Sequence, residues 1–290
     1  IYYPSFKTIA IGNLSTGGTG KTPMTEFLLK NLKYQSAAVV SRGYGRKTKG
    51  LLWVNPKGDA NNFGDEALQI AQKFPSVRVI VAEKRKLALE AALAINPDLA
   101  ILDDAYQHRS VQADAYIMLS AYHKLFTEDL ILPAGNLREA RCGARRAAII
   151  VVTKCPADLA EARKTEIKKG IARYSKAKVY FSALTYGPLK NCRDEELKLK
   201  RVILFSGIAY PEIMVEHLKS KLSLVDAHHY KDHYSFRNQD LKTLLAQAKK
   251  EKAALVCSEK DYVKVASLGL SQDELTNIYV LEVEHYFLNE

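Results

Sequence analysis

Short, mainly apolar runs alternate with helical patterns along the first two thirds of the chain. Runs of four to six residues occur at 8–12, 37–40, 77–82, 99–102, 115–119, 147–152 and 179–184. Between them, apolar residues recur at helical spacing after residue 23 and within 67–74, 84–95 and 157–174. Such alternation is typical of a buried parallel sheet with helices on both faces. The pattern therefore predicts an α/β fold with a doubly wound, mainly parallel sheet.

A polar segment interrupts this pattern at residues 190–201 and indicates a linker. A second α/β pattern follows it, with strand-like runs at 202–205, 253–257 and 278–283 and helix-like stretches at 212–222 and 241–251. We therefore expect a core domain over residues 1–189, the linker over 190–201, and a second, smaller α/β domain over 202–290.

A glycine-rich loop lies between the first predicted strand and the first predicted helix. Because Gly17, Gly18 and Gly20 have no side chains, the backbone can turn its N–H groups inward, and the helix start adds partial positive charge. Such donors suit a polyphosphate, with the Lys21 ammonium on the β- and γ-phosphates and the Thr22 hydroxyl on Mg²⁺. The nucleotide-binding residues predicted by this phosphate loop are Ser15, Thr16, Gly17, Gly18, Thr19, Gly20, Lys21 and Thr22.

The residue pattern of the loop leaves two alternatives to a standard phosphate loop to consider. The usual spacing G-x-x-x-x-G-K-[ST] has glycine where this chain has Ser15, so the segment could be a plain connection between strand and helix. The partitioning and metal-trafficking ATPases write the loop with a lysine before the glycine pair. That position is Thr16 here, which argues against this class.

Acidic residues follow the apolar run at 99–102. Asp103 and Asp104 stand where the carboxyl end of a parallel strand lies beside a phosphate loop, so they can hold Mg²⁺, although a solvated strand cap would look similar. Gln107 and His108 follow, with a weaker signal. Asp65 and Glu66 open a predicted helix, where acidic residues are common for reasons of capping alone.

Two other polar groups of residues leave alternatives open. Residues 226–234, which hold three histidines and two aspartates, suggest either a metal site or a hydrogen-bonded turn, because their spacing is not that of a helical zinc site. Basic residues gather at 42–49, 84–86 and 138–146, either as solvated faces or as a groove for phosphates.

Composition narrows the function classes. The 290 residues are 47% hydrophobic and 26% charged, as in an ordinary soluble globular protein, and the formal net charge of +11 implies an anionic partner: nucleic acid, an acidic membrane surface or a phosphorylated substrate. The four cysteines form no C-x-x-C pair, which argues against a zinc site or disulfide framework and favours a reducing cytoplasm. We find no membrane-spanning run and no signal peptide.

Several motifs, in order along the chain, resemble those of the tetraacyldisaccharide 4'-kinase family of lipid A biosynthesis. They occupy residues 11–23, 41–45, 64–66, 103–108, 132–139, 205–208, 232–234 and 258–261. Ser15 is itself typical of this family, which does not keep glycine there. The resemblance runs from residue 9 to about residue 264.

The resemblance implies an ATP-dependent, Mg²⁺-dependent kinase that phosphorylates the 4'-hydroxyl of a tetraacylated glucosamine disaccharide 1-phosphate and forms lipid IVA. It implies that Asp65 is the catalytic base, supported by His233, with Lys21 on the nucleotide. Glu66, Asp103, Asp104 and Thr22 would form the metal side of the site. It also implies a peripheral enzyme on the cytoplasmic face of the bacterial inner membrane, in contact with anionic lipid and with no nucleic acid or obligate protein partner.

The chain departs from the family pattern at a few positions. Ala105 and Tyr106 stand where the family has Gly-Leu, so we expect a slightly altered backbone there, and Asn136 stands where the family has proline. Family members usually begin with a hydrophobic, basic helix, which we expect to precede Ile1. Two rival functions remain open: a regulatory P-loop NTPase, and nucleic-acid binding through the positive charge, which lacks a recognisable module.

Overall fold

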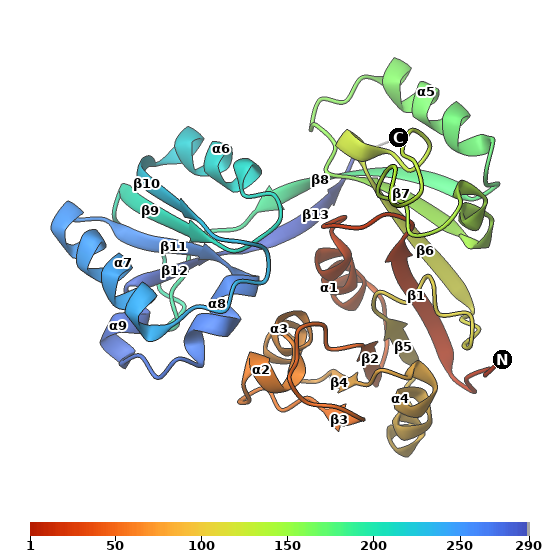
Figure 1. Ribbon diagram of the computed structural model, residues 1–290, viewed down its shortest axis with the longest axis horizontal. Coiled ribbons are helices and arrows are strands. Elements are labelled where there is room, and N and C mark those ends of the chain that lie inside the picture. The colour runs from red at the N-terminus through yellow and green to blue at the C-terminus, as the bar shows by residue number, and fades with distance from the viewer. Residues whose placement is uncertain (289–290) are drawn as a thin grey trace.

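The structure, a computed structural model, describes residues 1–288 and divides into two lobes (Figure 1). The first lobe holds a sheet of nine strands within these residues, and the second holds a sheet of four. Figure 1 shows helix α1 (Lys21–Asn31) in the first lobe, on the side that faces the second lobe.

The sheet of the first lobe is parallel except at its two edges. Its strands are β1 (Lys7–Asn13), β2 (Ala37–Ser41), β3 (Leu52–Trp53), β4 (Arg78–Val81), β5 (Leu99–Leu102), β6 (Ala115–Ala121), β7 (Ile149–Thr153), β8 (Lys178–Tyr186) and β13 (Val283–Phe287). Their order is β13-β8-β7-β6-β1-β5-β2-β4-β3, and only β13 and β3 pair antiparallel with their neighbours. The expected doubly wound, mainly parallel sheet is therefore confirmed.

Strand β1 occupies the position where the chain reverses its direction of travel across the sheet. β1 pairs with β5 on one side and with β6 on the other. In open α/β sheets, ligands bind outside the carboxyl ends of the strands at such a switch point. The loop after β1 is therefore at the place where this fold forms a binding site.

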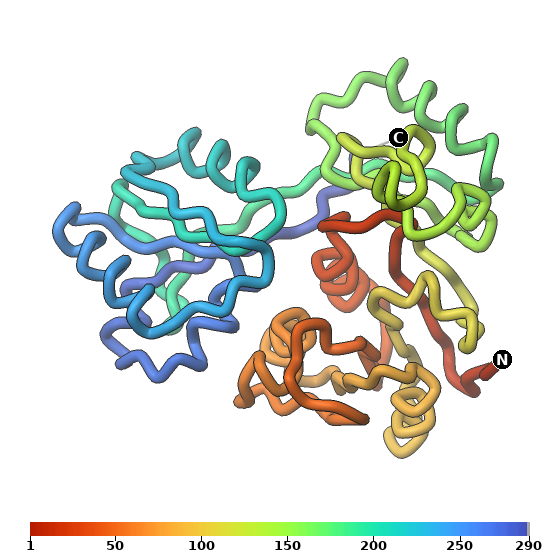
Figure 2. The backbone as a smooth tube through the Cα atoms, viewed as in Figure 1, coloured from red at the N-terminus to blue at the C-terminus, as the bar shows by residue number. Residues whose placement is uncertain are grey.

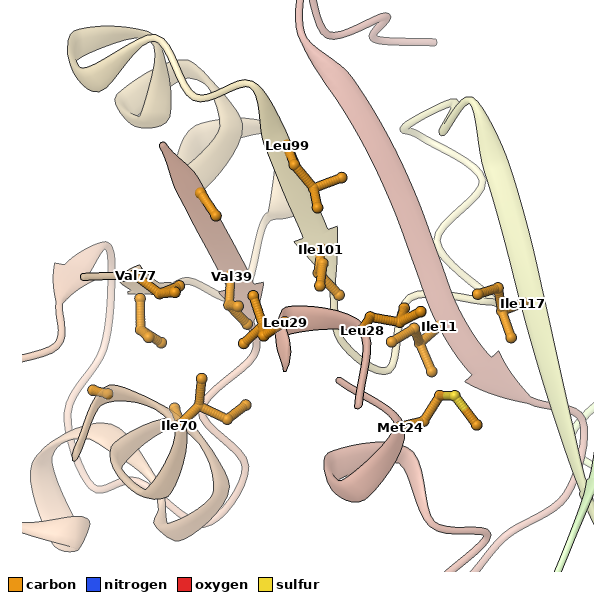
Figure 3. Close-up of a cluster of buried hydrophobic side chains, with 14 of the residues drawn as sticks. Ile11, Met24, Leu28, Leu29, Val39, Ile70, Val77, Leu99, Ile101 and Ile117 are labelled. Carbon is orange, nitrogen blue, oxygen red and sulfur yellow. The ribbon is translucent and has the colours of Figure 1, made fainter. Parts of the chain in front are cut away.

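Helices cover both faces of the first sheet because successive strand residues point to opposite sides. On one face, α1 and α3 (Asp65–Lys73) pack against the strands through buried side chains that include Met24, Ile70 and Ile101 (Figure 3). On the other face, α4 (Arg85–Ala92) and α5 (Glu161–Ala172) pack against β2, β5, β6 and β7. The first lobe also contains α2 (Ala60–Phe63) and short 3₁₀ turns at Leu93–Ile95, Tyr122–Lys124 and Arg141–Arg146.

The second lobe repeats this layered arrangement on a smaller scale. Its all-parallel sheet has the order β10-β9-β11-β12, formed by β9 (Arg201–Ser206), β10 (Ser223–His229), β11 (Ala254–Ser258) and β12 (Ile278–Leu281). Helix α6 (Glu212–Lys221) covers one face, and α7 (Asn238–Glu251) with α8 (Glu259–Ala266) covers the other. A short helix, α9 (Gln272–Thr276), precedes β12.

The strand order differs from the expected domain division at the C-terminal end. We expected residues 202–290 to form the smaller domain and 278–283 to be one strand. Instead, strand β12 ends at Leu281, and the chain crosses back to the first lobe, where β13 pairs with β8. Figure 2 shows the blue C-terminal tube running beside the green β8 between the lobes. The other boundaries of the division, including the linker, stay predictions.

The buried face in Figure 3 generates a stability prediction. Ile101 is fully buried in the central strand β5, so Ile101→Ala should leave a cavity and lower the free energy of unfolding by about 2–5 kcal/mol. Urea denaturation followed by circular dichroism measures this loss. Leu199→Ala, at a half-exposed position, is the matched control, and an equal loss in both variants would contradict the assignment of Ile101 to the core.

Candidate active site

The phosphate loop connects β1 to α1 at the switch point of the first sheet. Two of its glycines adopt the left-handed backbone conformation, Gly17 with φ 95° and Gly20 with φ 85°. Gly20 directly precedes Lys21, the first residue of α1, so the free N–H groups of the helix start adjoin the loop. The predicted strand, glycine-rich loop and helix are all present.

Side chains from neighbouring strands fix the shape of the loop. Asn13 Nδ2 donates to Thr19 Oγ1 at 2.9 Å, and Thr153 Oγ1, at the end of β7, donates to the Thr19 carbonyl at 2.8 Å. Farther along the chain, Thr16 N donates to the Asn136 carbonyl at 2.8 Å. The loop is therefore preorganised by contacts outside itself, which lowers the cost of ordering it around a ligand.

His285, from strand β13, binds the backbone at the end of the phosphate loop. Its Nε2 lies 3.0 Å from the Gly20 carbonyl, and its Nδ1 lies 3.0 Å from Ser182 Oγ. A carbonyl only accepts, so Nε2 carries the proton, and Nδ1 accepts from the Ser182 hydroxyl. Burial lowers the pKa of His285 to about 4, with a further contribution from the charge of Lys154, although the Gly20 carbonyl opposes the shift. His285 is therefore neutral at physiological pH.

Two aspartates follow strand β5 beside the loop. Lys21 Nζ lies 3.6 Å from Asp104 Oδ1. Burial raises the pKa of Asp103 to about 7, and the negative charges of Glu66 and Asp104 add to this shift. Asp103 Oδ1 and Asp104 Oδ1 are buried without a hydrogen-bond partner within residues 1–288. Mutually repelling carboxylates with unused oxygens fit a bound cation.

The protein alone does not complete a metal site. In the described part of the chain, no three His, Cys, Asp or Glu side chains are grouped so that they could hold an ion. Mg²⁺ in nucleotide sites is bound by one or two carboxylates together with substrate phosphates and waters, so this donor set fits Mg²⁺ brought with a nucleotide.

A hydrogen-bonded chain joins the two lobes next to these aspartates. Asp65 Oδ2, at the start of α3, lies 3.0 Å from His233 Nδ1, and His233 Nε2 lies 3.0 Å from Lys260 Nζ of α8. An ammonium only donates, so Nε2 accepts, and Nδ1–H donates to Asp65. Lys260 also lies 3.5 Å from Glu66 and 3.4 Å from Asp232. His233 therefore orients Asp65, and Lys260 selects the tautomer that does so.

The electrostatics of this chain keep Asp65 ionised. Burial raises the pKa of Asp65, but the hydrogen bond from His233 and the positive charge of Lys260 outweigh burial and lower the pKa below its usual value. Asp65 is therefore a buried carboxylate at neutral pH, able to accept a hydrogen bond from a further group.

Two hollows lie near this point, one lined by Glu66 and the other by its neighbour Asp65. The larger lies between the lobes and is lined by the phosphate loop from Gly18 to Pro23, by charged residues Glu66 and Lys260, and by an apolar wall of Ile208, Ile213, Met214 and Tyr186. The smaller is lined by Asp65, His233, Tyr44 and Lys264 among others. We call them the nucleotide cleft and the Asp65 hollow.

Comparison with known proteins identifies the family. Residues 2–290 match the family described as LpxK, tetraacyldisaccharide-1-P 4'-kinase. The chain belongs to this family. It is 40% identical to the tetraacyldisaccharide 4'-kinase of Flavobacterium psychrophilum, over 97% of this chain and 82% of that protein. Identity to the enzyme of the same name from Bacteroides thetaiotaomicron is 38%, over 95% of this chain and 79% of that protein.

A solved structure of the family has the same fold. LpxK from Aquifex aeolicus, crystallised in complex with ATP, superposes with a TM-score of 0.75 at 28% sequence identity, over 99% of this chain and 86% of that one. The superposition spans both lobes, so the Aquifex relative shares the two-lobed arrangement.

The structure places the predicted LpxK site residues in one region, while their roles stay predictions. Lys21 and Thr22 begin α1, Asp103 and Asp104 adjoin them, and Asp65 contacts His233 across the lobes. Gln107 donates to the Asn13 carbonyl and to Glu139, so it fixes the end of β1 where the phosphate loop begins. We find no hydrogen bond from the His108 side chain within residues 1–288.

The polar group at 226–234 divides between two environments. Asp226 and His228 lie in strand β10 and bind Gln247, while His233 reaches Asp65. The metal alternative for this segment is therefore wrong, since the described residues form no metal-binding group there, and the turn alternative applies only to the residues after His229.

The basic stretches also divide. Arg85 is buried and donates to the Asp103 carbonyl at 3.0 Å, so it is neither a solvated residue nor part of a groove. Arg138 lies 3.5 Å from Asp104 and does face the site. Two positions depart from the family pattern. Beside Ala105, which replaces the family's glycine, the positive φ falls on Asp104, at 44°, and not on Ala105 itself. The N–H of Asn136, which replaces the family's proline, donates to Asp129, a bond that proline could not make.

Four residues of the site were missed or given no role in the sequence analysis. Lys260 and His285 act through contacts between distant segments. Lys154, after β7, and Tyr210, after β9, both line the nucleotide cleft, with Lys154 Nζ 4.6 Å from the Tyr210 ring centroid. Burial lowers the pKa of Lys154 to about 8. The only available signal was that Lys154 follows a parallel strand, at the edge where the phosphate loop also lies.

Gly64 generates a prediction about how Asp65 is positioned. Its φ is 87°, and a Cβ there would lie 2.8 Å from the Tyr44 carbonyl, so Gly64→Ala should shift the start of α3 and lower kcat by about tenfold or more, with little change in nucleotide affinity. Gly45→Ala is the control, because Gly45 also has positive φ but nothing within 4 Å. Equal losses in both variants would mean that backbone strain alone is responsible.

His285 generates a prediction about pH. Its folded-state pKa of about 4 lies below the ordinary 6.5, so between about pH 6.5 and pH 4 the unfolded chain binds a proton that the folded protein excludes. The free energy of unfolding should therefore fall as pH decreases through this window, and His285→Gln should make the fall shallower. Urea midpoints across the window measure it. Ile101→Ala should shift the curve without changing its slope, and a wild-type slope in His285→Gln would contradict the assignment.

Proposed function

We infer that the protein is an ATP-dependent kinase that transfers the γ-phosphate to the 4'-hydroxyl of a tetraacylated glucosamine disaccharide 1-phosphate, as its family does in lipid A biosynthesis. The observation that carries the inference is the ionised Asp65, held by His233 in a chain that has a phosphate loop and belongs to this family. A phosphate donor site and an acceptor base in one site are what a kinase requires.

The nucleotide cleft supplies the donor half of this proposal. Its phosphate loop and Lys21 suit the triphosphate, and its apolar wall, with Ile208, Ile213 and Met214, suits a purine ring. The Aquifex relative was crystallised with ATP, which supports ATP as the donor. Lys154 lies beside Gly18 and adds a second cation, after Lys21, to the nucleotide cleft.

A Mg²⁺ ion brought with the nucleotide fits the chemistry of the acidic residues. Thr22, Asp103, Asp104 and Glu66 would hold it, on the evidence of the unpartnered carboxylate oxygens and the raised pKa of Asp103. When bound, the ion neutralises charge on the transferring phosphoryl group. Lys21 and the backbone N–H groups of the phosphate loop would bind the phosphate oxygens.

Asp65 supplies the acceptor half. Its carboxylate can accept the hydrogen bond of the sugar hydroxyl, orient that oxygen for in-line attack and take up its proton. His233 and Lys260 come from the second lobe, so this arrangement is complete only when the lobes are together, which also excludes water. The basic residues around Arg138 suit the 1-phosphate of the substrate.

We further propose that the protein works at the cytoplasmic face of the inner membrane. None of the helices within residues 1–288 has the length and apolarity needed to cross a bilayer. Support for a peripheral contact comes from the formal charge of +11, since anionic headgroups attract basic proteins.

A lipid acceptor assay tests the proposed function. We expect transfer of a radiolabelled γ-phosphate to the acylated disaccharide 1-phosphate, a kcat lower by about 10²-fold or more in Asp65→Ala, and a raised KM for ATP with reduced kcat in Lys21→Ala. Asp158→Ala, which removes an exposed carboxylate outside the site, is the control.

Three outcomes would contradict the proposal. Transfer to a nucleoside or a protein with none to the lipid would sink it. ATP hydrolysis that ignores the lipid, together with nucleotide-dependent association, would favour the regulatory NTPase. Steeply salt-dependent retention on DNA would favour nucleic-acid binding.

A further inference from the structure

The segment 130–134 exposes five consecutive apolar residues, Leu130, Ile131, Leu132, Pro133 and Ala134. The three large side chains are 55%, 48% and 50% exposed. Isolated exposed apolar residues are ordinary, but a contiguous exposed run of this length marks a surface that contacts something apolar. We call these five residues the apolar loop.

Hydrogen bonds fix the backbone of the apolar loop. Leu132 N donates to the Leu137 carbonyl, and Leu137 N donates to the Leu130 carbonyl, both at 2.9 Å. Asp129 Oδ1 accepts from Leu130 N at 2.9 Å, and the Arg141 guanidinium donates to the Asp129 carbonyl. Because these bonds hold the backbone in place, the outward direction of the three large side chains is a built feature of the fold.

The apolar loop is attached to the phosphate loop through Leu137. Leu137 forms β-bridges with both Ile131 and Ser15, and Arg138 N donates to the Leu14 carbonyl at 2.7 Å. Figure 2 shows this yellow-green part of the chain above the red end of β1. A surface that binds to the apolar loop is therefore held at a fixed position relative to the transferring phosphate.

Basic residues flank the apolar loop on both sides in the chain. Lys124 precedes it and is near enough for its charge to help lower the pKa of Asp129, which adjoins the loop, and Arg145 follows it in the chain. Arg138 also follows it but pairs with Asp104 at the site. The nearby acids are already engaged, Asp129 by backbone N–H groups and Glu128 by Arg163 at 3.7 Å. An apolar tip flanked in the chain by basic residues is complementary to the interface of an anionic bilayer, where acyl chains lie under phosphate headgroups.

We propose that the apolar loop inserts into the interface of an anionic phospholipid bilayer and so holds the phosphate loop against the membrane that carries the acceptor. The proposal rests on the proposed function only in that the acceptor is a membrane lipid. A second copy of the chain is a poorer occupant, because two chains of formal charge +11 repel each other at their basic flanks.

Vesicle co-sedimentation with the full chain tests the proposal. Vesicles of phosphatidylethanolamine with phosphatidylglycerol should retain the wild type, and Ile131→Asp should weaken retention by about tenfold or more, because an apolar side chain is replaced by a charge that headgroups repel. Ile131→Phe keeps the position apolar and should retain the wild-type affinity. Leu199→Asp introduces the same charge at a position of similar exposure, shortly before β9, and should also bind as the wild type does.

Each contrary result overturns the proposal. Retention of Ile131→Asp at the wild-type level removes the contact, and equal losses in Ile131→Asp and Ile131→Phe would show a distorted loop. Equal losses in Ile131→Asp and Leu199→Asp would show a net-charge effect. If Ile131→Asp bound vesicles as the wild type does but had a lower molecular mass in solution, the apolar loop would instead contact a second copy of the chain. Failure of the proposed function looks different, since the wild type would bind vesicles without phosphorylating the acylated disaccharide.

Discussion

The structure depends on charges buried where helix α3 of the first lobe meets helix α8 of the second. Lys73 lies within ion-pair distance of Glu26 and Glu259, and Asp65 reaches Lys260 through His233. Removing such charges from water costs several kcal/mol per ion, so the network adds little net stability, although losing one partner would cost about 3–5 kcal/mol. Its effect is to favour the relative position of the lobes in which His233 binds Asp65.

In the proposed mechanism, this network leaves Asp65 a weak base. His233 and Lys260 lower the pKa of Asp65, which makes it a poorer proton acceptor. In phosphoryl transfer, however, the transition state is loose and little proton transfer has occurred when the barrier is crossed, so the orientation of the attacking oxygen counts for more than basicity. A carboxylate that is ionised and held in one orientation then lowers the barrier more than a stronger base that is free to rotate.

Local patterns predicted the parts of the site that lie on one segment. The strand, glycine-rich loop and helix around Lys21 and the two acids after β5 follow from periodicity and spacing alone. The pairing of Asp65 with His233, 168 residues apart, could come only from the family resemblance. The return of β13 to the first sheet was missed, because a strand-like run at 278–283 does not show where the strand ends or which strand the next segment pairs with. His285 was missed with it.

The same limit applies to the apolar loop, and its position has a mechanical consequence. Residues 132–139 were read as a motif, but exposure depends on the tertiary fold, and no periodicity marks which apolar residues face outward. A loop bonded on one side to Ser15 and Thr16 and apolar on the other cannot move toward lipid without moving the phosphate loop. Rigid coupling of this kind spares the enzyme the entropy of ordering two separate binding surfaces, because one set of hydrogen bonds positions both donor and membrane.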